Sequence, residues 1–148
     1  MDEFPPAPPA NPADLLVMVV DDESDIRVLV EYNLQKEGFK TIAASDGVDA
    51  LEKIEPRAPD LIFLDLMMPR QSGYEFLRHL QSTGHGRIPI IIATARSLDS
   101  TTVALILQEA NAVEFFTKPF NWPLILAAIH KHLKTLRPSP RLKDKPGL

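Results

Sequence analysis

Five short, mostly apolar runs alternate with amphipathic stretches along the 148 residues of this chain. The apolar runs cover residues 15–20, 39–44, 61–64, 88–93 and 112–116. Each run is short enough for a strand that is buried on both faces, and the stretches between the runs carry apolar residues at helical spacing. Strict alternation of strand and helix predicts a parallel sheet covered by helices on both faces, and right-handed crossovers leave few topologies for it.

The expected fold is therefore α/β, a flavodoxin-like, doubly wound, five-stranded parallel sheet in the strand order 2-1-3-4-5 with five helices. We expect Ser24 or Asp22 to cap the first helix, Asp46 to cap the second and Asn121 to cap the last. The buried stripes expected for the first and last helices are Ile26, Leu29, Val30 and Leu34, and then Ile125, Ala128, Ile129, Leu133 and Leu136.

Composition divides the chain into a leader, one domain and a tail. Residues 1–13 hold five of the fourteen prolines, and we expect a disordered, extended leader there. Residues 14–137 have the length and the apolar content of one folded domain. Residues 138–148 are basic and polar, which predicts a flexible tail. With no further module in the sequence, we expect the protein to act by docking to other proteins and not to contact nucleic acid directly.

The location of the protein is also suggested by composition. The chain contains no cysteine, so disulfides and thiolate metal sites are excluded. Its first residues lack the features of a signal peptide, and no segment has the 18 or so apolar residues that a membrane span needs. We expect a cytoplasmic protein without membrane contact. The net charge of −4 leaves an acidic body because basic residues gather near the end, and this balance suits a cation site.

Carboxylates follow two of the expected strands at the edge of the sheet where ligands bind. Asp21 and Asp22 come directly after the first strand, and Asp65 comes directly after the third. These strands are neighbours in the order 2-1-3-4-5, so we expect the three side chains to converge in one crevice. Each close pair of ionised carboxylates repels by about 4 kcal/mol at an effective dielectric constant near 20. A hard divalent cation, Mg²⁺ or Mn²⁺, would neutralise them.

Two more side chains are expected at the same edge. Lys118 follows the last strand, and Thr94 follows the fourth. Carboxylate, metal, ammonium and hydroxyl groups together can hold a phosphoryl group, with Asp65 as the nucleophile. Each signal is weak alone, because a Lys-Pro pair is commonly a surface turn and an Asp-Asp pair is commonly a helix cap. Their occurrence at four strand ends makes the combination specific.

From residue 15 to about residue 136 the chain resembles the receiver domain of bacterial two-component response regulators. The resemblance rests on residues 19–23 (VVDDE), 60–69 (DLIFLDLMMP), 94–95 (TA) and 115–120 (FFTKPF). It implies a signalling phosphoacceptor, which is not an enzyme with a separate substrate.

The resemblance also implies a role for each matching residue. Asp65 would accept a phosphoryl group from a phosphohistidine on a sensor histidine kinase or a histidine phosphotransfer protein. Asp22 would bind Mg²⁺ directly, Asp21 would bind it largely through water, and Met67 would offer its backbone carbonyl. Lys118 would bind the phosphoryl oxygens.

A conformational switch is implied by the same family. Thr94, beside Ala95 in the phosphoryl-binding set, would swing inward to hydrogen-bond the phosphate, and the ring of Phe115 would rotate toward the interior. The surface formed by the fourth helix, the fifth strand and the fifth helix would then change and bind a downstream protein target. Phe115 stands where the family often has tyrosine, so it has no hydroxyl to offer a partner.

The helix expected near residues 98–110 is unusually apolar outside its buried stripe. Leu98, Ala104 and Leu105 fall on the side that we expect to face solvent. These side chains could form a docking surface or a homodimer face, or they could be scattered surface residues of the ordinary kind.

Two other functions stay open at this point. A hydrolase with an aspartyl-phosphate intermediate could share this layout, but it would need a second acid two residues after the nucleophile, where Met67 stands. A phosphate-independent, receiver-like interaction module would keep the same fold. The histidines show no metal-ligand spacing and no acid partner in the sequence, so we expect surface or packing roles for His79, His85, His130 and His132.

Overall fold

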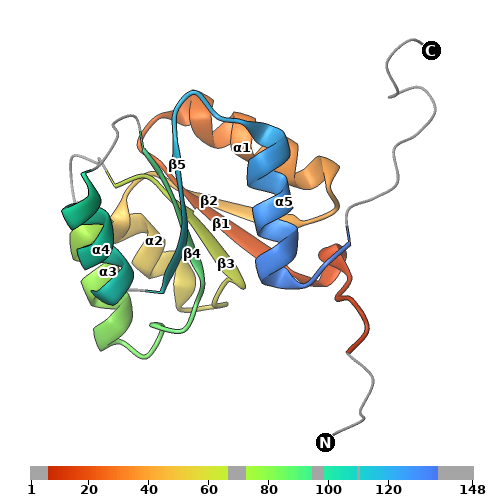
Figure 1. Ribbon diagram of the computed structural model, residues 1–148. Helices are drawn as coiled ribbons and strands as arrows, with labels where there is room; N and C mark the ends of the chain where they lie inside the picture. The colour runs from red at the N-terminus through yellow and green to blue at the C-terminus, as the bar shows by residue number, and fades with distance from the viewer. Residues whose placement is uncertain (1–6, 67–72, 95–98, 110, 137–148) are drawn as a thin grey trace, which may run out of the picture.

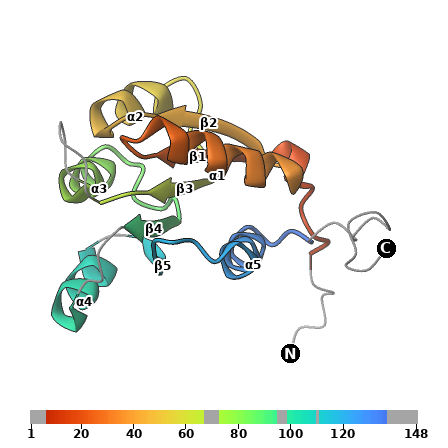
Figure 2. The same ribbon diagram turned by 90° about the horizontal axis from the view of Figure 1, so that it is seen from above.

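The computed structural model describes residues 7–66, 73–94, 99–109 and 111–136. Its strands are β1 (Leu16–Val20), β2 (Lys40–Ala44), β3 (Leu61–Leu64), β4 (Ile90–Thr94) and β5 (Ala112–Thr117). Neighbouring strands are all parallel, and their order is β2-β1-β3-β4-β5. Figure 2 shows this order from one edge of the sheet to the other. The predicted topology is confirmed.

Helices cover both faces of the sheet. They are α1 (Ser24–Lys36), α2 (Gly47–Ile54), α3 (Gly73–Ser82), α4 (Ser100–Glu109) and α5 (Trp122–Leu133). Helices α1 and α5 lie on one side, and α2, α3 and α4 lie on the other (Figure 1). A short 3-10 helix, η1 (Pro12–Asp14), precedes β1.

Strand residues alternate between two apolar cores because successive side chains point to opposite faces. Along β3, Leu61 and Phe63 belong to the core beneath α1 and α5, whereas Ile62 and Leu64 belong to the core beneath α2, α3 and α4. All four residues are buried, as expected for a central parallel strand. This rigid sheet fixes the strand ends at which the candidate site lies.

Two of the three predicted helix caps are present. The side chain of Asp46 accepts a hydrogen bond from the Asp49 N–H at the start of α2, and Asn121 accepts one from the Leu124 N–H at the start of α5. At α1 the residue before the helix is Glu23, which makes no side-chain capping bond. The prediction that Ser24 or Asp22 would cap α1 is therefore wrong.

Two residues of the predicted buried stripes are exposed. Leu29 is 42% exposed, because α1 buries only a narrow stripe made by Val30 and Leu34. Leu136 is 69% exposed, because α5 ends three residues earlier at Leu133. The left-handed backbone at Lys134, with φ 57°, turns the chain out of the helix there.

The described part of the proline-rich leader contacts the domain. The Ala10 N–H donates to the Lys134 carbonyl at 2.9 Å, and Ala10 forms a parallel bridge with Thr135. Asn11 caps η1 by accepting the Ala13 N–H at 3.0 Å. Residues 10–13 belong to the leader that we expected to be extended and disordered, and Ala10 among them bonds to the end of α5.

Candidate phosphoryl and cation site

The three predicted carboxylates converge where β1 and β3 end. Val20 of β1 pairs with Leu64 of β3, which places Asp21 and Asp65 on neighbouring strand ends. The Asp65 N–H donates to the Val20 carbonyl at 2.9 Å and continues the ladder into the site. Asp21, Asp22 and Asp65 each offer a carboxylate oxygen, and these atoms lie within 4.8 Å of one another. Asp21 and Asp65 are buried, whereas Asp22 is exposed.

Every polar group of Asp21 has a hydrogen-bond partner. Its N–H donates to the Ala44 carbonyl at 3.2 Å, and its carbonyl accepts from Arg27 Nη1 at 2.8 Å. Its Oδ1 accepts from the Glu23 N–H at 2.9 Å, and its Oδ2 accepts from Lys118 Nζ at 3.1 Å. The residue is held from β2, from α1 and from the end of β5, so its carboxylate has a fixed position.

Lys118 brings a positive charge to the same edge. Its Nζ lies 3.1 Å from Asp21 Oδ2 and 3.5 Å from Asp65 Oδ2. Burial by itself would lower the pKa of Lys118, but attraction by Asp21, and then by Asp65 and Glu23, outweighs it and holds the pKa above its ordinary value. The lysine is therefore a permanent cation between two carboxylates. Phe120 supports it from below, with the ring centroid 5.9 Å from Nζ.

Thr94 ends β4 beside Lys118, whose N–H donates to the Thr94 carbonyl at 2.9 Å. The Thr94 side chain is buried, and its hydroxyl oxygen has no hydrogen-bond partner among the described residues. A buried hydroxyl without a partner costs free energy. Thr94 ends the strand next to β3, so it lies at the same end of the sheet as Asp65. Phe115 is half-buried and packs against the core beneath α2, α3 and α4.

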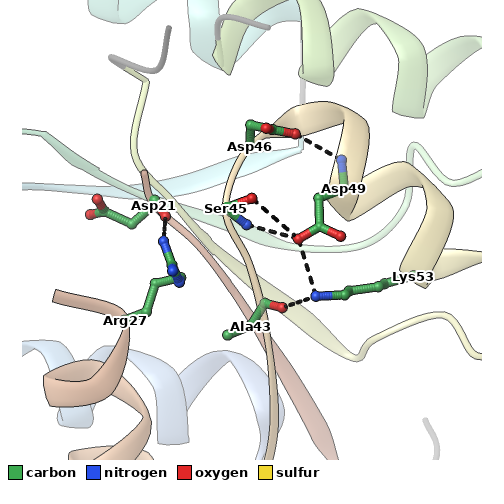
Figure 3. Close-up of polar contacts among 7 residues, drawn as sticks. All are labelled: Asp21, Arg27, Ala43, Ser45, Asp46, Asp49 and Lys53. Atoms are coloured by element: carbon green, nitrogen blue, oxygen red, sulfur yellow. Dashed lines mark hydrogen bonds and ion pairs between the residues drawn. The ribbon is translucent and has the colours of Figure 1, made fainter. Parts of the chain in front are cut away.

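A polar corner between β2 and α2 borders the site (Figure 3). Asp49 Oδ2 accepts from the Ser45 N–H at 3.0 Å and from Lys53 Nζ at 3.1 Å, and Lys53 Nζ also donates to the Ala43 carbonyl. Burial by itself would raise the pKa of Asp49, but the hydrogen bonds from Ser45 and Lys53 and the charge of Lys53 together outweigh it and lower the pKa. This corner fixes the end of β2, which in turn holds Asp21 through Ala44.

Gly73 brings α3 close to the residue that follows Asp65. A Cβ atom on Gly73 would lie 2.6 Å from the Leu66 Cα, and the Gly73 N–H donates to the Leu66 carbonyl at 3.0 Å. Only glycine allows this approach of two backbones. The contact between Gly73 and Leu66 therefore ties the start of α3 to the residue that follows Asp65.

Not every predicted site residue falls in the described structure. Met67, Ala95 and Leu98 lie outside the described residues. Ala104 and Leu105 of α4 are exposed, and Leu105 is 53% exposed.

Sequence reasoning missed Arg27, because its bond to Asp21 comes from a side chain on the following helix. It also missed an apolar patch on α1, composed of Val28, Leu29 and Tyr32, which are 66%, 42% and 58% exposed. The spacing of Val28 and Tyr32, four residues apart on a helix, was the available signal for this patch.

The expectation that the histidines lack acid partners is wrong for two of them. His130 Nε2 lies 2.8 Å from Glu37 Oε1, and His132 Nε2 lies 2.9 Å from Glu114 Oε2. The first pair joins α5 to the end of α1, and the second joins α5 to β5. Both pairs depend on the tertiary fold, so no local spacing could reveal them.

Comparison with known proteins decides the family. The response regulator receiver domain family matches residues 17–130. The chain belongs to this family. It is 37% identical over 131 residues to the alkaline phosphatase synthesis transcriptional regulatory protein PhoP of Bacillus subtilis, covering 86% of this chain and 53% of that protein. It is 38% identical over 122 residues to the response regulator MprA of Mycobacterium leprae, covering 82% of this chain and 52% of that protein.

Solved structures of receiver domains have the same fold. The receiver domain of a putative Luxo repressor protein from Vibrio parahaemolyticus matches with a TM-score of 0.74 and 30% identity, covering 81% of this chain and 90% of that one. The chemotaxis protein CheY4 of Vibrio cholerae matches with a TM-score of 0.72 and 28% identity, covering 79% and 97%. Membership of this family supports a phosphoacceptor role in two-component signalling. The chain spans about half the length of the curated relatives it matches.

Among the described residues, no helix is long and apolar enough to cross a membrane.

Proposed function

We propose that Asp65 accepts the phosphoryl group from a phosphohistidine of a sensor histidine kinase or a histidine phosphotransfer protein. The convergence of Asp21, Asp22 and Asp65 with Lys118 supports this proposal. Transfer breaks the N–P bond of the phosphohistidine and forms an O–P bond at the Asp65 carboxylate, and the histidine keeps the electron pair of the broken bond. Lys118 stabilises the charge on the transferred oxygens.

The donor set of the site fits Mg²⁺ or Mn²⁺. Asp21, Asp22 and Asp65 provide hard oxygen ligands, and Met67 would add its backbone carbonyl. When bound, the cation supplies the charge neutralisation that one lysine cannot give to three carboxylates. In this proposal Asp21 and Asp22 hold the cation in place, and the Asp65 carboxylate attacks the phosphorus atom. Lys118 holds the phosphoryl oxygens together with Thr94 and the Ala95 backbone.

Phosphorylation would change the surface of the protein through movements of Thr94 and Phe115. The unpartnered Thr94 hydroxyl gains an acceptor when a phosphoryl oxygen arrives, and its movement makes room for Phe115 to turn inward. The changed surface of α4, β5 and α5 would dock a downstream protein target or a second copy of the chain. Exposed Ala104 and Leu105, with Leu98, supply apolar area for that contact.

The α1 patch is our candidate for the phosphodonor contact. A donor histidine must approach the carboxyl ends of the strands, and α1 begins there, at Ser24. Val28, Leu29 and Tyr32 give a partner helix an apolar surface beside the site. In this proposal the protein is a cytoplasmic signalling phosphoacceptor. Its only chemistry is the gain and loss of the phosphoryl group on its own aspartate.

Intact-mass spectrometry with a small-molecule phosphodonor tests the central claim. One added phosphoryl group that requires Mg²⁺ and is absent from Asp65→Ala would support Asp65 as the acceptor. No addition to a folded wild-type protein by a competent donor would favour the alternative, a phosphate-independent interaction module.

Analytical ultracentrifugation tests the dimer. A larger species in the presence of a phosphoryl mimic, lost in Leu105→Glu, would support self-association through α4. A monomer under both conditions would leave the downstream protein as the target of this surface.

A further inference from the structure

The turn between β1 and α1 carries two of the three carboxylates, and a side chain of α1 bonds to its backbone. Arg27 lies in the first turn of α1, and its Nη1 reaches back to the Asp21 carbonyl at 2.8 Å (Figure 3). The backbone N–H of the same residue donates to the Glu23 carbonyl at 3.1 Å. That second bond is the ordinary first hydrogen bond of the helix, so the contribution particular to the arginine is its side-chain bond to the Asp21 carbonyl.

Asp22 depends on this support more than its neighbours do. The carboxylate of Asp21 is fixed by the Glu23 N–H and by Lys118, whereas the Asp22 side chain is exposed. The position of the Asp22 carboxylate is therefore set by its backbone. We infer that Arg27 is a positioning residue that orders the 21–23 turn so that Asp22 and Asp21 present their oxygens to the cation; this inference rests on the proposed function.

The effect of removing Arg27 on Mg²⁺ affinity distinguishes a positioning role from a purely electrostatic one. The guanidinium is a positive charge beside a cation site, so its removal should strengthen Mg²⁺ binding if charge alone mattered. If Arg27 orders the ligands, its removal should weaken Mg²⁺ binding, because the turn must be ordered when the ion binds. The sign of the change separates the two roles.

The test is calorimetric titration of the full chain with Mg²⁺ at fixed ionic strength. For Arg27→Gln we expect the Kd for Mg²⁺ to rise about three- to tenfold, which corresponds to the net contribution of one typical hydrogen bond. Arg27→Lys should lie between Arg27→Gln and wild type, because its ammonium group keeps one donor near the carbonyls. Arg57→Gln is the matched control, because exposed Arg57 contacts only the Asp14 carbonyl, at 3.4 Å, among the contacts described. We expect no change for it.

Each outcome has a separate meaning. Unchanged or tighter Mg²⁺ binding by a folded Arg27→Gln, or weaker binding by Arg27→Lys than by Arg27→Gln, would overturn the positioning role and leave the proposed function intact. Failure of the wild-type protein to bind Mg²⁺ would overturn this inference together with the proposed cation site. Circular dichroism melts of all three variants establish that binding is compared between folded proteins.

Discussion

At the scale of single residues, Thr94 carries a buried hydroxyl that lowers the stability of the folded protein. Its hydroxyl is buried and lacks a partner among the described residues, although a valine of nearly the same shape would fit β4 without that cost. A hydroxyl at this position fits the proposed function, in which a phosphoryl oxygen enters the site and accepts a hydrogen bond from it.

Thr94→Val tests this argument. We expect the free energy of unfolding of the unphosphorylated protein to rise by about 1 kcal/mol, because a buried polar group without a partner is removed. Urea denaturation measures this difference. Thr94→Ser is the control, since it keeps the hydroxyl and loses a methyl group, and we expect it to be less stable than wild type. A less stable Thr94→Val would show that the hydroxyl already has a partner.

At the scale of elements, the corner between β2 and α2 ties a helix to the strand that holds Asp21. Asp49 is its centre, with bonds to Ser45 and Lys53. Its pKa is lowered in the folded protein, so the folded state favours the ionised carboxylate. Stability from this group is present above the unfolded pKa, which is near 3.8, and is lost as pH falls through the lower folded value.

Asp49→Asn should therefore lower the free energy of unfolding at pH 7 by about 0.5–1 kcal/mol, the scale of a partly exposed charged hydrogen bond. The difference between wild type and variant should shrink as pH falls below about 4. Urea denaturation at a series of pH values measures it. A difference that stays constant down to pH 2.5 would contradict the assignment to the ionised form.

Two histidine–glutamate pairs anchor α5, and they differ in burial. His130 is buried, bonds Glu37 and Thr135 and packs its ring 5.1 Å from that of Phe39. His132 is partly exposed and bonds Glu114 alone among the contacts described. Buried groups lose packing and leave partners unsatisfied when truncated, whereas exposed ion pairs contribute little.

We expect His130→Ala to lower the free energy of unfolding by about 2–4 kcal/mol, and His132→Ala to lower it by less than about 1 kcal/mol. Guanidinium denaturation of both variants provides a matched pair on one helix. Equal losses would mean that the Glu37 and Thr135 contacts are not responsible for the stability of this end of α5.

The sequence predicted the elements and the convergence of the carboxylates because both follow from local periodicity and from the rules of parallel sheets. Asp21, Asp22, Asp65 and Lys118 come together simply because they follow strands. The contacts of Arg27, His130 and His132 were not predicted, because each depends on a partner that only the tertiary fold supplies. Leu29 was misassigned because the apolar pattern of α1 is wider than the stripe that the sheet covers.

At the scale of the whole molecule, different groups lie at the two ends of the parallel strands. The carboxylates, Lys118 and Thr94 lie at the carboxyl ends. Residues 10–14 lie at the amino ends beside the end of α5, where Ala10 bonds to Lys134. The described parts of the two chain ends therefore meet at the end of the sheet opposite the candidate site (Figure 1).

Deletion of residues 1–11 tests whether these two ends of the sheet are independent. We expect the free energy of unfolding to fall by about 1–2 kcal/mol, because the bond from Ala10 to Lys134 and the Asn11 cap of η1 are lost. Deletion of residues 1–6 is the matched control, since it keeps all of these contacts. The rate of phosphorylation at Asp65 should be the same in both proteins, because distant sites without shared partners contribute additively. A slower rate in the longer deletion alone would show that the amino-terminal end of the sheet is coupled to the site, with α5 and its buried His130 as the connecting element.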